Sequence, residues 1–150
     1  MKYKVSLARA ALIAAVYVVL CLALQPISYG VIQLRVAEAL TLLPILYVEA
    51  IPGLFVGAFI ANIFGGLGLV DIVCGSLITL MAAYATFLLR DSRLAYLPPV
   101  VFNGLFVSAY LHLLFGWPYW LTVLSISASE ALVVFTLGHL LVTFLRKRVR

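Results

Sequence analysis

The chain has 150 residues, of which 66% are hydrophobic and only 10% are charged, whereas an ordinary soluble domain carries about 25% charged residues. With a mean hydropathy of +1.22, we interpret it as an integral membrane protein with no polar stretch long enough to fold as a separate ATPase, nuclease or other soluble domain. The net charge of +5 comes from basic residues at the chain ends and in one loop, which membrane topology explains without nucleic acid.

The apolar stretches predict six transmembrane helices, since about 20 apolar residues are needed for each crossing. In chain order the predicted helices span residues 5–24, 35–48, 51–64, 69–89, 97–115 and 119–145. We expect one all-α integral membrane domain over residues 1–150, a six-helix bundle with both termini in the cytoplasm.

The stretch 34–64 is the ambiguous part, because Pro44, Glu49 and Pro52 interrupt it. It fits one kinked helix or two short ones. Only two helices place the N-terminus, the loop at Arg90 and the C-terminal basic cluster all on the cytoplasmic side, as the positive-inside rule requires. Each short helix is about 20 Å long, so we expect both to lie within the bundle, with irregular backbone that lines a cavity. We interpret Glu49 as solvated or turn-forming.

Polar side chains within the bundle are candidate functional residues, because an unpaired ionisable group in lipid is costly. Counted along the helices, one group lies near the outer surface and a second lies about 16 to 18 Å deep. The outer group is Arg35, Glu38, Asn62, Asp71 and His112, and the deeper group is Asn103 and Glu130. The pattern predicts a cup that opens to the outside, with a polar rim and a polar floor.

Structural explanations remain open for some of these residues. Arg35 and Glu38 have the spacing of an ion pair on one helix face, and Asp71 is placed to cap a helix start. His112 fits an interfacial side chain whose polar tip reaches water. Glu130 is the hardest to explain this way, because a long apolar stretch separates it from the C-terminal basic residues.

Helical phase limits which residues on the predicted helix 97–115 share a pocket. At 100° per residue, Asn103 and Tyr110 lie on one face and His112 lies nearly opposite Asn103. We therefore favour Asn103 and Tyr110 as pocket residues and keep His112 as a secondary candidate.

Small residues on the first helix form two pairs, Ala10 with Ala14 and Ala11 with Ala15. Such pairs let another helix approach closely, either within the bundle or from a separate subunit. No HExxH, GxSxG or phosphate-loop motif and no metal-ligand pair of histidines is present,. We do not expect an enzyme; a membrane enzyme using His112 and Glu130, or a purely structural bundle, are minor alternatives.

The chain resembles the queuosine-precursor transporter (QueT) family along nearly its whole length. The resemblance is carried by IQLRVAEALTLLP from Ile32 to Pro44, EAIPGLFVG from Glu49 to Gly57, GGLGLVDIVCGSLITL from Gly65 to Leu80, and LPPVVFNGL from Leu97 to Leu105. Ala37 departs from the small hydroxyl residue expected in that family. The family consists of substrate-binding S-components of energy-coupling factor (ECF) transporters.

The resemblance implies partners and a place in the cell. The partners are a membrane scaffold subunit and two cytoplasmic ATPases, so ATP is used by those subunits and no cofactor is expected here. The protein is then a multi-pass protein of the plasma membrane. The alanine pairs of the first helix match the scaffold-docking motif of S-components, and the outer loop with Tyr29 and Gln33 would close over the substrate.

The substrate class that the resemblance implies is a 7-deazaguanine, as the cyano or aminomethyl derivative or as queuine. A guanine-like edge offers a ring N–H and an amino group, which one carboxylate accepts together. We expect Glu130 or Glu38 to take this edge, Asn103 the carbonyl and Asp71 a cationic aminomethyl group. Tyr110 and Trp117 are candidate stacking faces, and Arg35 belongs to the closing loop. The alternative within transport is an S-component for another vitamin or nucleobase.

Overall fold

The computed structural model describes residues 6–28 and 34–149. It is 87% helical, and no strand occurs within these two described ranges, which confirms the all-α prediction. Three helical rods are long and apolar enough to cross a membrane, Asp71–Leu88, Arg93–Phe115 and Tyr119–Arg148. Three shorter apolar helices accompany them, so the count of six crossings stays a prediction.

The short helices come first in the chain. They are α1 (Leu7–Ala23), the single turn α2 (Gln25–Ser28), the 3-10 helix η1 (Val36–Ile45) and α3 (Ala50–Gly65). Their order and bounds follow the predicted helices 5–24, 35–48 and 51–64 closely.

The three long rods each contain a π-helical turn. The first joins the turn η2 (Asp71–Gly75) to α4 (Ser76–Leu88), and the second runs through η3 (Arg93–Tyr96), α5 (Leu97–Phe102), η4 (Asn103–Val107) and α6 (Ser108–Phe115). The third consists of α7 (Tyr119–Val133), η5 (Val134–Gly138) and α8 (His139–Val149). Gly116 adopts a positive φ of 68°, which ends the second rod and lets the chain reverse.

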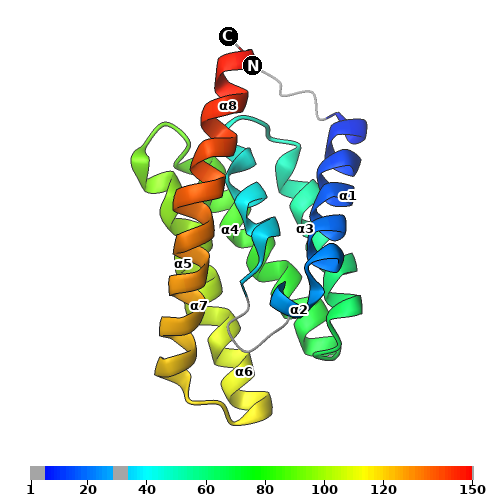
Figure 1. Cartoon of the computed structure of the whole chain (residues 1–150), viewed down its shortest axis with the longest axis vertical. Coiled ribbons are helices and arrows are strands. Elements are labelled where there is room, and N and C mark those ends of the chain that lie inside the picture. The colour runs from blue at the N-terminus through cyan, green and yellow to red at the C-terminus, as the bar shows by residue number, and fades with distance from the viewer. Residues whose placement is uncertain (1–5, 29–33, 150) are drawn as a thin grey trace.

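The helix η1 is the centre of the bundle. All nine residues 37–45 are buried, and the helix contacts α1, α3, α4, α7, η5 and α8; Figure 1 shows this cyan segment among the other helices. Its 3-10 winding rises about 2.0 Å per residue instead of about 1.5 Å in an α-helix. The ten residues of η1 therefore reach farther into the bundle than an α-helix of that length, and they carry Glu38 and Thr41 into the interior.

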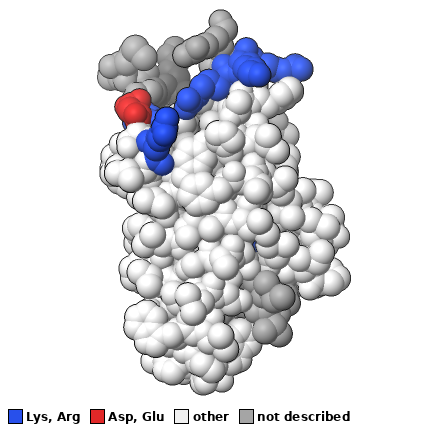
Figure 2. Space-filling model, turned by 60° about the vertical axis from the view of Figure 1, so that its left-hand side comes forward, with Lys and Arg blue, Asp and Glu red and all other residues white. Residues whose placement is uncertain are grey.

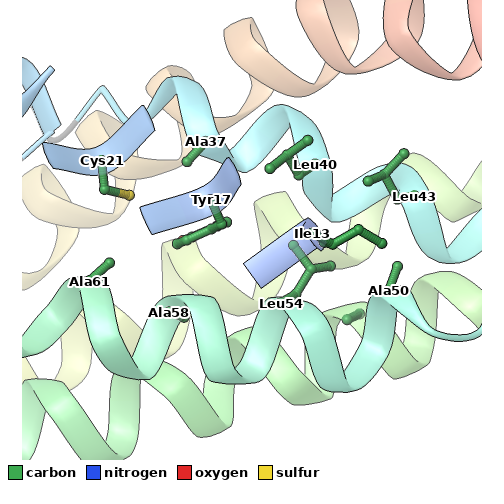
Figure 3. Packing of buried hydrophobic residues seen from close by; sticks show 11 residues of the cluster. Ile13, Tyr17, Cys21, Ala37, Leu40, Leu43, Ala50, Leu54, Ala58 and Ala61 are labelled. Atoms are coloured by element: carbon green, nitrogen blue, oxygen red, sulfur yellow. The ribbon is translucent and has the colours of Figure 1, made fainter. Parts of the chain in front are cut away.

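The helices α1 and α3 cross at very close range. A Cβ atom on Gly53 would lie 2.7 Å from the carbonyl oxygen of Ala10, and one on Gly57 would lie 3.2 Å from Cα of Ala14. Beside this crossing, α1, η1 and α3 enclose an apolar cluster around Tyr17 (Figure 3). Close packing of small residues is the usual way to join helices in a membrane.

This crossing divides the two alanine pairs of α1 between different surfaces. Ala10 and Ala14 are buried and pack within the bundle against α3, whereas Ala11 and Ala15 are exposed on the outer face. The sequence left open whether these alanines pack within the bundle or contact a separate subunit, and the structure assigns packing within the bundle to Ala10 and Ala14. Only Ala11 and Ala15 remain available for docking a separate subunit, and that role stays a prediction.

Basic side chains gather at one end of the bundle. In Figure 1 the start of α1 and the end of α8 lie at the same, upper end, and Figure 2 shows Lys and Arg as a band across this end. The cytoplasmic location of both chain ends, which the positive-inside rule predicts, stays a prediction.

Glu49 lies at the same end. It lies in a turn directly before α3, which confirms the turn-forming interpretation, whereas the interpretation as a solvated residue was wrong. The residue is 5% exposed, and Arg9 Nη1 donates to its Oε1 at 3.0 Å. The guanidinium also lies 4.8 Å from the centre of the Tyr47 ring. This pair could not be predicted from sequence spacing, because 40 positions separate its members.

Candidate functional site

A small cavity lies inside the bundle, between η1 and the three long rods. It is lined by Arg35, Glu38, Gly75, Thr79, Asn103, Val107, Tyr110, Ile126 and Glu130. Its volume is about 20 Å³, which is room for about one water molecule. Five of the predicted site residues thus meet around one enclosed space.

Glu38 enters this space from the buried helix η1. The hydroxyl of Tyr17, on α1, donates to its Oε1, and the hydroxyl of Thr41 donates to its backbone carbonyl at 2.6 Å. Its second oxygen, Oε2, has no hydrogen-bond partner among the described residues. A buried carboxylate oxygen without a partner carries a large desolvation cost, so Oε2 is available for a donor from a ligand.

Glu130 and Asn103 face the same cavity from α7 and η4. Each is 7% exposed, and both line the cavity together with Glu38. The charges of Glu38 and Arg35 act on the Glu130 carboxyl, whose Oε1 has no partner within the described part of the chain. The two deep residues predicted from helix counting therefore lie together, and Glu38 joins them.

Asp71 anchors a second network at the edge of the cavity. The hydroxyl of Tyr110 donates to its Oδ1, and Asn62 Nδ2 donates to its backbone carbonyl at 3.1 Å. Gly75 makes room for this contact, because a Cβ there would lie 2.7 Å from Asn62 Nδ2. Asp71 Oδ2 is buried without a partner among the residues that the structure describes.

Arg35 joins the two networks. Its Nη1 donates to Asn62 Oδ1 at 3.2 Å, and its Nε donates to the carbonyl of Ser28 at 3.3 Å, so it ties the chain on one side of residues 29–33 to the other side. The charges of Glu38 and Asp71 both act on its guanidinium. The described site thus holds three carboxyl groups and one cation, a composition that favours a ligand rich in N–H donors or positively charged.

Two of the three π-helical turns begin at site residues. The turn η2 starts at Asp71 and η4 starts at Asn103. A π-helical turn widens the helix locally and changes the direction of the side chains that follow, and such turns are frequent at functional sites. They account for how Gly75 and Val107, on two different rods, both reach the cavity wall.

The structure does not bring His112 into this cavity. His112 lies in the last turn of α6, where its Nδ1 donates to the carbonyl of Trp117 at 2.6 Å. Its ring lies edge-on to Tyr119. Trp117 itself packs on the apolar cluster that contains Tyr110. Tyr29 and Gln33, predicted for the closing loop, lie outside the described residues.

Sequence reasoning missed five residues of the site. Tyr17 donates to Glu38, and Gly75, Thr79, Val107 and Ile126 line the cavity. Tyr17 carried a usable signal, because a phenol in an aliphatic membrane helix needs a hydrogen-bond partner. Gly75 and Thr79 carried none, since small residues are common along such helices.

Comparisons with known proteins identify one family. The model of a family described as QueT transporter matches residues 7–147, nearly the whole chain. No curated protein and no solved structure matches the chain.

Proposed function

The chain belongs to the QueT transporter family, and we propose that it is the S-component of an ECF-type importer that captures a queuosine precursor. Membership of a transporter family and the apolar helices make it a membrane protein of transport. The finer assignment rests on one observation. Three carboxyl side chains, each with a buried and unpartnered oxygen, surround or adjoin a single cavity.

The unpartnered oxygens support a 7-deazaguanine as the ligand. Its guanine-like edge presents a ring N–H and an amino group, and its carbonyl accepts a hydrogen bond. Glu130 and Glu38 are placed to receive the donors, and the Asn103 amide is placed to donate to the carbonyl. Asp71, on the adjoining network, would pair with a cationic aminomethyl group.

The size of the cavity supports capture by an opening motion. A flat bicyclic ligand needs far more than the present 20 Å³, because small-molecule sites have volumes of about 300 Å³ or more. Arg35 Nε donates a hydrogen bond to the carbonyl of Ser28, and this bond would have to break or lengthen as the site opens. We propose that Tyr29 and Gln33, which follow Ser28 in the chain, belong to the loop that opens and closes the site.

Titration calorimetry of the purified chain tests the substrate class. We expect binding of 7-cyano- or 7-aminomethyl-7-deazaguanine, or of queuine, and no binding of adenine. Glu130→Gln should weaken binding by about 1.5 to 3 kcal/mol, about 10- to 100-fold, because a charged acceptor is lost. Asp91→Asn makes the same chemical change at a carboxyl that is 92% exposed and should leave the affinity unchanged.

Two results would contradict this proposal. Binding of adenine or a vitamin, without binding of any deazaguanine, would show that the substrate is not a 7-deazaguanine. Mass spectrometry of the co-purified ligand would then identify the substrate. An affinity unchanged by Glu130→Gln would remove Glu130 from the site.

Membership of the QueT transporter family supports partners that supply the energy. These are a scaffold subunit in the plasma membrane and two ATPases on its cytoplasmic side. The exposed Ala11 and Ala15 of α1 offer a surface on which a scaffold helix can approach closely. Ala10 and Ala14 are already covered by α3, so we assign docking to the outer pair alone.

A further inference from the structure

A second, larger pocket lies at the basic end of the bundle, away from the substrate cavity. It has a volume of about 530 Å³ and is lined by Arg90, Arg93, Tyr96, Phe135, His139 and Arg146, together with Ile45, Asp91 and Ser92. Its walls come from the connection between α4 and α5 on one side and from η5 and α8 on the other. Figure 2 shows the Lys and Arg side chains gathered at this end of the bundle.

The lining of this pocket is strongly cationic. Three guanidinium groups face one carboxyl, Asp91, which is 92% exposed and 4.0 Å from Arg90 Nε, so it neutralises little of the charge. Neither Arg93 nor Arg146 forms an ion pair within the described part of the chain. The basic surface continues into an adjoining pocket lined by Lys147.

Below the arginines the pocket is aromatic and polar. The ring of Tyr96 stacks on Phe135 at 5.8 Å and 13°, and the Tyr96 hydroxyl lies 3.1 Å from His139 Nδ1. This contact fixes the two side chains against each other. The Tyr96 hydroxyl and the His139 ring thus add hydrogen-bonding groups to the pocket. Its guanidinium groups already have the geometry to donate to phosphate oxygens.

The surface next to the pocket is apolar and exposed. Leu94 is 54% exposed, Leu97 43% and Phe135 50%, and in a membrane these side chains face acyl chains. An anion bound at the arginines would therefore have water on one side and hydrocarbon on the other. That combination suits an amphiphile better than a free inorganic anion.

We propose that this pocket binds the phosphodiester headgroup of an anionic glycerophospholipid such as phosphatidylglycerol. Arg93 and Arg146, from two separate elements, contact the phosphate, and the acyl chains lie along Leu97 and Phe135. Basic pockets at the cytoplasmic face of membrane proteins commonly hold such headgroups. The bound lipid bridges the α4–α5 connection to α8 and so holds the inner end of the bundle in its leaflet. This site is independent of the transported substrate.

Native mass spectrometry of the purified full chain in a neutral detergent tests the proposal. The probes are phosphatidylglycerol and phosphatidylcholine with identical acyl chains, and inorganic phosphate. We expect phosphatidylglycerol to bind at least about tenfold more tightly than phosphatidylcholine, since phosphatidylcholine brings its own cation to the arginines. Arg93→Gln and Arg146→Gln should each weaken its binding about tenfold.

The matched control is Arg148→Gln, which removes the same charge from α8 at a residue outside the pocket, stacked on Phe144. It should change the affinity by less than about twofold if position rather than net charge matters. An equal loss in this control, or no preference for phosphatidylglycerol, would overturn the proposal. Displacement of the lipid by inorganic phosphate at equal concentration would instead assign the pocket to a soluble anion.

Folding is controlled by measuring the melting temperature of each variant without lipid. Arg93 and Arg146 lie on different elements and are both exposed, so a folding defect common to both is not expected. Arg93→Lys keeps the charge and should retain part of the affinity. Full affinity in Arg93→Gln contradicts the site. An affinity in Arg93→Lys that is no higher than in Arg93→Gln, with normal melting, contradicts a contact based on charge.

Discussion

The hydroxyl of Tyr17 on α1 donates a hydrogen bond to Oε1 of Glu38 in the candidate substrate cavity. Both side chains are buried. Ala11 and Ala15 lie about 120° and about 160° around α1 from Tyr17 and are exposed. One helix therefore contacts the candidate substrate site on its inner face and presents the candidate docking surface on its outer face.

Removing this hydrogen bond tests how much it contributes. Tyr17→Phe keeps the ring in the apolar cluster but leaves Glu38 Oε1 without a donor. The variant should lose about 1 to 3 kcal/mol of stability, the cost of a buried acceptor without a partner, and bind the ligand more weakly because Glu38 is no longer held in position. Thermal melting and titration calorimetry measure the two effects.

Tyr84→Phe is the control for Tyr17→Phe, since Tyr84 is 54% exposed and its hydroxyl has no contact with the cavity lining. It should leave both measurements unchanged. Normal melting and normal affinity in Tyr17→Phe would show that the contact with Glu38 contributes to neither property.

Asp71→Asn distinguishes the two smaller candidate ligands. An amide oxygen can still accept from Tyr110, so the network at Oδ1 is preserved while the negative charge is lost. Binding of the aminomethyl derivative should weaken by about 1.5 to 3 kcal/mol, the usual value for a charged hydrogen bond, and binding of the neutral cyano derivative should change much less. Calorimetry with both ligands on one protein preparation makes the comparison. Equal losses of affinity for the two ligands would show that Asp71 does not contact the aminomethyl group.

The composition and helical phase predicted the membrane class and much of the site. Depth counted along the helices grouped Asn103 with Glu130, and the 100° rotation per residue separated Asn103 and Tyr110 from His112. These arguments succeed because a long, apolar helix has a regular geometry that its sequence reveals.

The local windings and the long-range pairs were not predictable in this way. A 3-10 segment such as η1 and the π turns at Asp71 and Asn103 arise from packing against neighbouring helices and leave no periodic pattern in the sequence. The pair of Arg9 and Glu49 and the bond from Tyr17 to Glu38 join residues 40 and 21 positions apart. Only the folded bundle brings such residues together.

Gly53→Ala tests the crossing of α1 and α3. The added Cβ would lie 2.7 Å from a backbone oxygen of Ala10 and 3.1 Å from the Ile13 side chain, and backbone cannot rotate away. Overpacking of this kind should cost about 1 to 3 kcal/mol, seen as a lower melting temperature. Ala11→Leu adds more volume to α1 but on its exposed face, so its melting temperature should stay near that of the parent chain. A Gly53→Ala protein as stable as the parent would show that the helices separate freely.

Ala15→Trp tests the proposed docking surface. The indole would hold a scaffold helix away from α1, because close approach requires small side chains at the contact. Since Ala15 is exposed, the substrate cavity should be unaffected. We expect co-purification with the scaffold and its ATPases, and uptake in reconstituted vesicles, to fall at least about tenfold, a coupling loss of about 1.4 kcal/mol or more, with the substrate affinity of the isolated chain unchanged.

The control for docking is Leu113→Trp, which places the same indole on α6 at a residue that is 82% exposed. A large apolar side chain facing lipid there should affect neither assembly nor uptake. If Ala15→Trp assembles as fully as Leu113→Trp, the outer face of α1 is not the docking surface. If Ala15→Trp assembles normally but transports poorly, α1 acts after docking. The hydrogen bond from Tyr17 to Glu38 would then be the next contact to test, because it joins α1 directly to the cavity lining.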